Sequence, residues 1–173
     1  MSPETLFRLH LILGYVVWLP CFGAYIWPRL KALEPFDAMR AIATLHSFRF
    51  FGLAFMLPGV VSPDLPAGFA NAAAYGDLTT GLLALLALLT ARKRPLFWTF
   101  AVTLNVVGMV DILLAYYHAI ATGVSAHAGE FGAMYAIPVI FVPLLVITHV
   151  AALRLLPLPR ARLAQQPART VAR

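Results

Sequence analysis

Residues 40–61 form an apolar run long enough to cross a lipid bilayer, and this run carries both His46 and Arg49. About 20 helical residues cross a hydrocarbon core of about 30 Å. An unpaired charge at its centre costs at least about 2.5–3.5 kcal/mol. A guanidinium stays protonated, so Arg49 needs an acceptor from elsewhere in the chain. The remaining sequence must therefore supply neighbouring helices and a carboxylate at a similar depth.

The composition supports a membrane protein. Hydrophobic residues make up 61% of the chain and charged residues 12%, against about 45–50% and about 25% in soluble domains. Further long apolar runs cover residues 6–27, 69–91, 96–121 and 133–156. We therefore predict an all-α polytopic membrane protein with one transmembrane domain, residues 1–156, built as a bundle of five transmembrane helices.

Basic residues gather in alternate connections between these runs. They follow the first run as Arg29, Lys31 and Arg40, the third run as Arg92, Lys93 and Arg94, and the end of the fifth run from Arg154 onward. Cytoplasmic loops carry an excess of Lys and Arg. The pattern predicts an N-terminus outside and a C-terminus in the cytoplasm.

The net charge of +6 has the same origin. Because the basic residues lie between and after apolar runs, they indicate membrane orientation and not nucleic-acid binding. Residues 157–173 hold four arginines and no acidic residue. We expect this segment to be a disordered cytoplasmic tail that lies against anionic lipid.

Helix geometry converts the predicted runs into depths. At about 1.5 Å per residue, Asp77 and Asp111 lie about 5 Å to the outer side of the midplane, and Arg49 lies within about 3 Å of it. The inner side holds a second polar layer, at about 5–10 Å from the midplane, which consists of His46, Asn105 and His149. Tyr135 shares a helical face with His149. These seven residues are the candidate polar core and ligand-binding set.

The charges within the core do not balance. Arg49 is expected to pair with Asp77 or Asp111, which leaves one carboxylate over. Because burial disfavours the charged form, that carboxylate is expected to be protonated or paired with a histidine. A purely structural interpretation stays open, in which the ion pair fixes the register of the helices and the histidines are packing residues.

Residues 58–66, Pro-Gly-Val-Val-Ser-Pro-Asp-Leu-Pro, and residues 73–77, Ala-Ala-Tyr-Gly-Asp, carry a resemblance. With these motifs and the stretch 137–149, the chain resembles a group of small bacterial multi-pass inner-membrane proteins that has no assigned function. The resemblance implies a bacterial cytoplasmic membrane protein. It implies no reaction and no ligand.

Three functional hypotheses follow. The first is an intramembrane polar cavity that binds a small amphipathic ligand or relays protons, because intramembrane ionisable groups mark functional sites. The second is a b-type haem redox protein, with His46 and His149 as ligands from two helices at one depth. The third is a non-catalytic accessory or assembly subunit of a larger membrane complex, and a homo-oligomer is compatible with each.

The sequence does not decide whether the protein is an enzyme. The two aspartates are suited to acid and base chemistry. The sequence contains no His-Glu-x-x-His metal motif, no Gly-x-Ser-x-Gly motif and no phosphate-binding loop, so no metal site and no specific reaction are predicted.

Overall fold

The computed structural model describes residues 1–156, which are almost entirely helical. In chain order the elements are α1 (Pro3–Cys21), η1 (Phe22–Ile26), α2 (Trp27–Ala32), α3 (Pro35–Ser47), η2 (Phe48–Met56), α4 (Ala67–Leu89), α5 (Arg94–Ala121), η3 (Val124–Tyr135), η4 (Ile137–Phe141) and α6 (Val142–Leu155). The segments η1 and η4 are π-helices, and η2 and η3 are 3-10 helices. The described part contains no strand, so the predicted all-α class is confirmed there. The predicted basic tail, residues 157–173, lies outside the described residues.

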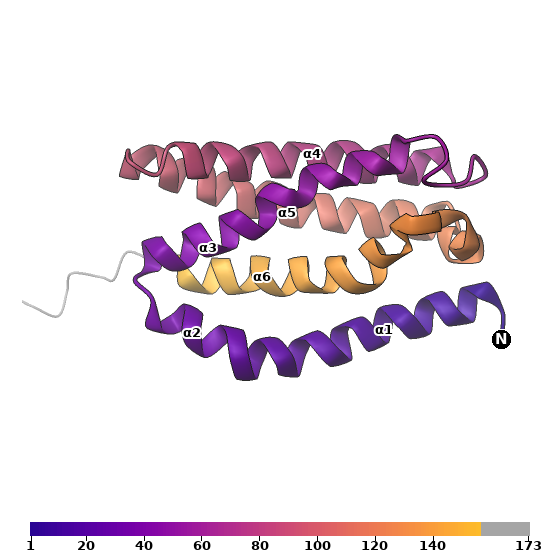
Figure 1. Ribbon diagram of the computed structural model, residues 1–173, viewed down its shortest axis with the longest axis horizontal. Coiled ribbons are helices and arrows are strands. Elements are labelled where there is room, and N and C mark those ends of the chain that lie inside the picture. The colour runs from indigo at the N-terminus through magenta and orange to yellow at the C-terminus, as the bar shows by residue number, and fades with distance from the viewer. Residues whose placement is uncertain (157–173) are drawn as a thin grey trace, which may run out of the picture.

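The helices run side by side along the long axis of the molecule (Figure 1). Helix α4 packs on α3, η2 and α5, while α1 packs on η3, η4 and α6. Helix α1 therefore lies on one side of the bundle, and a single residue of it, Phe7, is buried. The chain reverses direction at the end of η2 and again after α4 and α5, so segments distant in sequence lie next to each other (Figure 1).

Four helices of the described chain are long and apolar enough to cross a membrane, not the five that we predicted. They are Pro3–Ala32, Ala67–Leu89, Arg94–Ala121 and Ile137–Leu155. The predicted run 40–61 differs because its helix changes type at Phe48 and ends before Leu57. Neither the 13 residues of α3 nor the 9 residues of η2 reach spanning length alone.

Close contact with α4 accounts for the unusual geometry of η2. Runs of 3-10 helix longer than 3–4 residues are uncommon, because their hydrogen bonds are poorly aligned. A Cβ on Gly81 of α4 would lie 2.9 Å from the backbone nitrogen of Phe50, and a Cβ on Gly52 of η2 would overlap Asp77. The two backbones thus meet at glycines, and this packing holds η2 in place.

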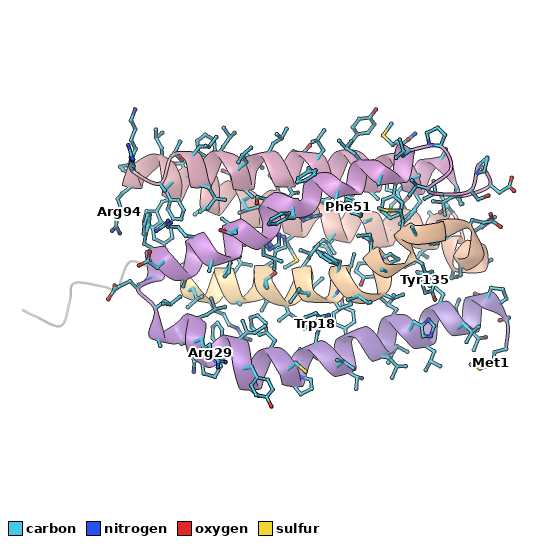
Figure 2. All side chains as sticks on the ribbon, in the orientation of Figure 1. Met1, Trp18, Arg29, Phe51, Arg94 and Tyr135 are labelled. Carbon is cyan, nitrogen blue, oxygen red and sulfur yellow. The ribbon has the colours of Figure 1, made fainter. Side chains whose placement is uncertain are left out.

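Prolines shape the last spanning segment in a similar way. Pro143 has no N–H for the carbonyl of Val139, one turn earlier. That carbonyl instead faces Gly14 of α1, where a Cβ would overlap it. The neighbouring carbonyl of Ile140 accepts a hydrogen bond of 2.9 Å from Trp18 Nε1, also on α1 (Figure 2). Helix α1 therefore covers the backbone that the prolines leave open.

The apolar core is divided in two. One cluster surrounds Met39, Phe97 and Leu104, and the other surrounds Phe69 and Phe131. Buried polar side chains form a third group, which comprises His46, Arg49, Asp77, Thr80, Asn105, Thr148 and His149. Many large apolar side chains, such as those of Ile12, Leu113 and Val110, point outward instead, as expected for helices in lipid.

Candidate functional site

Arg49 joins three elements through its guanidinium. Its Nε donates a hydrogen bond of 2.6 Å to Asp77 Oδ1 on α4, and its Nη2 donates to Asp111 Oδ2 on α5. The side chain of Arg49 is 4% exposed, and each aspartate side chain is 12% exposed. We expected one of the aspartates to pair with Arg49, and the structure brings both to it. We call Arg49, Asp77 and Asp111 the charged triad.

Glycines make room for both carboxylates. A Cβ on Gly52 would overlap the carboxylate of Asp77, and a Cβ on Gly76 would overlap that of Asp111. Each carboxylate therefore occupies a space left by a missing side chain on the neighbouring helix. The sequence shows a glycine, Gly76, directly before Asp77. Helix spacing alone does not tell which neighbouring helix a glycine faces, so the sequence did not predict its contact with Asp111.

On its other side, Arg49 begins a chain of hydrogen bonds through polar side chains. Its Nη1 donates to His149 Nε2 at 3.4 Å, and His149 Nδ1 lies 3.0 Å from Asn105 Oδ1. Asn105 Nδ2 donates to the carbonyl of Ala101 at 2.7 Å. Because guanidinium only donates, Nε2 of His149 must accept, and its proton lies on Nδ1. His149 is therefore uncharged in this arrangement.

The ring of His46 contacts the ring of His149, but the hydrogen bond of His46 goes to a different residue, Thr148. The two ring centroids are 4.0 Å apart with an interplanar angle of 39°. His46 Nε2 lies 3.1 Å from Thr148 Oγ1, and that hydroxyl donates to the carbonyl of Leu144 at 2.9 Å. The His46 Nε2 atom is therefore the donor, and its Nδ1 is buried without a hydrogen-bond partner among the described residues. Thr148, which our sequence analysis did not select, completes this layer.

The geometry of His46 and His149 does not fit a haem. Two imidazoles on opposite sides of an iron need ring centroids about 6 Å apart, given metal–nitrogen bonds of about 2 Å. These rings are in direct contact at 4.0 Å, which leaves no space for a porphyrin between them. Both Nε2 atoms are already hydrogen-bonded to protein side chains.

Two other expectations about the polar core also change. Tyr135 does not join the charged triad: its hydroxyl lies 2.9 Å from His10 Nδ1, between η3 and α1 (Figure 2). Within the described chain, neither aspartate of the triad has a hydrogen bond to a histidine. The surplus carboxylate is therefore not paired with a histidine, which was one of the two predicted arrangements.

The charged triad lies at one side of a cavity of about 260 Å³. Its walls are apolar, and they include Phe7, Leu11, Phe55, Phe69, Ala73, Ala115, Ala119 and Val142. Arg8 and Ile120, which are exposed, also line it, so the opening lies between the start of α1 and the end of α5. Below them, the hydroxyls of Tyr15 and Tyr116 are 2.9 Å apart and connect the same two helices. Our sequence analysis predicted a polar cavity, but not these walls.

Comparison with known proteins identifies a family. Residues 6–157 match the model of a family described as Domain of unknown function (DUF8737). The chain belongs to this family. No curated protein and no solved structure matches it. The family description assigns no reaction.

Proposed function

We propose that this protein binds a small amphipathic ligand within the membrane, in the cavity beside the charged triad. One observation carries the proposal: an apolar cavity of about 260 Å³ ends on three ionisable side chains. Ligand sites are mostly apolar hollows with a few polar groups that fix orientation, and most are about 300–1,000 Å³. This cavity is near the lower limit, which favours a small molecule.

Binding agrees with the geometry better than proton relay does. The hydrogen bonds that run from Arg49 through His149 and Asn105 end on the backbone carbonyl of Ala101. A backbone carbonyl does not take up a proton near neutral pH, so the path does not continue there. His46 Nδ1 has no described partner that would extend the path. A purely structural ion pair, in turn, requires no cavity beside it.

We further propose that α3 and η2 together make an additional crossing of the membrane, as part of a five-helix bundle. The two elements lie along α4 (Figure 1), and η2 holds Arg49 level with Asp77 and Asp111, which are far from the ends of α4 and α5. Arg29 and Arg94 lie at the same end of the molecule (Figure 2). This charge distribution favours that end as cytoplasmic, and the resemblance to small bacterial proteins favours a bacterial inner membrane.

Titration of small amphiphiles into the detergent-purified full chain tests the binding proposal. We would use 1-hexylamine, 1-hexanol and hexanoate, which share one tail, and follow the heat of binding by calorimetry against empty micelles. Saturable binding of at least one probe is expected. Ala115→Phe, which fills the cavity, should abolish that binding.

The matched control is Leu113→Phe on the same helix, because Leu113 is 61% exposed and points away from the cavity. It places the same phenyl ring on the outward-facing side of α5 and should leave binding unchanged. The proposal fails if no probe binds saturably, or if Ala115→Phe binds the probes as the unmodified chain does.

A further inference from the structure

We propose that the ligand of this cavity is an organic ammonium ion, with its nitrogen on the charged triad and its apolar part against the aromatic wall. This inference rests on the proposed function and specifies its substrate class. It is carried by three observations: two unpartnered carboxylate oxygens, an arginine whose three nitrogens are all engaged, and aromatic rings beside them.

The first observation concerns hydrogen-bond acceptors. Arg49 engages one oxygen of each carboxylate, Asp77 Oδ1 and Asp111 Oδ2. The other oxygen of each has no hydrogen-bond partner in the described chain, although Asp77 is only 9% exposed. Unlike His46 Nδ1, these oxygens are not enclosed by protein, and both residues line the cavity. Each aspartate that lines the cavity therefore keeps one carboxylate oxygen without a protein donor.

The second observation concerns donors and charge. The Nε, Nη1 and Nη2 atoms of Arg49 each donate to a protein acceptor, and its side chain is 4% exposed. Because Arg49 is so little exposed and lies between two carboxylates, an anionic ligand would meet negative charge at this site. Two carboxylates and one guanidinium also carry a formal charge of −1 when both acids are ionised. A buried site needs that charge compensated, either by a proton on one aspartate or by a ligand cation that takes the place of the proton.

The third observation concerns the wall. Phe7 of α1, Phe55 of η2 and Phe69 of α4 line the cavity together with the triad. The rings of Phe55 and Phe69 meet edge to face at a centroid distance of 5.8 Å. Aromatic faces attract organic cations and also pack against aliphatic groups. A cavity lined by carboxylates and by aromatic rings is thus suited to a cation with an apolar substituent.

The cation at the opening does not oppose this assignment. Arg8 lines the cavity, but its Nη2 lies 2.6 Å from Glu4 Oε1, and the two side chains are 68% and 44% exposed. Ser125 Oγ also contacts Glu4, at 3.5 Å. The opening is therefore lined by a solvated, charge-balanced pair.

The same three probes distinguish the ligand class. Hexylammonium should bind at least about tenfold more tightly than 1-hexanol, because a hydrogen bond between an ammonium and a carboxylate is stronger than one between neutral groups. Hexanoate should bind more weakly than 1-hexanol. Asp111→Asn should weaken hexylammonium binding about tenfold and leave 1-hexanol binding within about twofold. Asp64→Asn, on an exposed loop, is the matched control and should change neither.

Each failure has its own signature. If 1-hexanol or hexanoate binds as tightly as hexylammonium, and Ala115→Phe still abolishes binding, the cavity binds ligands but the ammonium assignment is wrong. If no probe binds, the proposed function fails and this inference fails with it. Should Asp111→Asn not fold, the order of the three probes on the unmodified chain still decides the assignment.

Discussion

At the scale of single residues, Arg49 organises the interior. It lies between two carboxylates on one side and an uncharged imidazole on the other, and it is 6% exposed. Removing one member of a buried ion pair leaves the others uncompensated, which costs more than the pair itself contributes. The triad is therefore the point at which a single substitution has the largest effect.

We expect Arg49→Met to destabilise the folded chain by about 3–5 kcal/mol, because two buried aspartates lose their cation. Thermal unfolding of the detergent-purified protein, with folded yield from membranes, measures this. Arg40→Met is the matched control: Arg40 pairs with Asp37 at 3.3 Å, but both side chains are about half exposed, so its effect should be within about 1 kcal/mol. Equal unfolding temperatures for the two variants would contradict the role given to Arg49.

At the scale of elements, α1 differs from the rest of the bundle. It contributes the residues Phe7, Arg8 and Leu11 to the cavity, yet it has one buried residue and packs mainly on η3, η4 and α6. Its attachment depends on a few specific contacts with the backbone around the prolines of the last spanning segment. Close approach at Gly14 and the hydrogen bond from Trp18 are two of these.

Gly14→Ala should therefore loosen α1, because the new Cβ would overlap the carbonyl of Val139. Hydrogen exchange measured by mass spectrometry should show faster exchange in α1 and η4, with α4 and α5 unchanged. Gly23→Ala, in the adjoining η1, is the control, since a Cβ there meets nothing within 4 Å and should if anything favour the helix. Equal exchange in both variants would mean that Gly14 does not determine the packing of α1.

At the scale of the whole molecule, the proposed crossing by α3 and η2 determines on which side of a membrane each connection lies. Four described helices meet the length and apolarity needed to cross, and α3 and η2 are not among them. The basic residues Arg29 and Arg94 at one end of the molecule favour a cytoplasmic location for that end. An additional crossing by α3 and η2 is needed for both to lie on one side.

Cysteine accessibility in intact cells tests this path. In a Cys21→Ser background, single substitutions Glu34→Cys, Asp64→Cys and Lys93→Cys would be treated with a membrane-impermeant thiol reagent. We expect labelling at position 64 alone in intact cells, and at all three after the membrane is opened. If positions 34 and 64 label alike in intact cells, α3 and η2 do not cross.

Much of this fold follows from its sequence, because long apolar runs without turn residues favour long helices. The apolar runs predicted the all-helical class, and the need of Arg49 for an acceptor pointed to Asp77 and Asp111 at similar depth. The sequence did not predict that η2 is a 3-10 helix, because its geometry depends on the contact with Gly81 of another helix. It also did not predict that His46 and His149 stack without space for a haem, or that Tyr135 bonds to His10. Depth follows from counting residues along one helix, whereas the direction of a side chain and the space beside it depend on how several helices pack, and only the tertiary structure decides those.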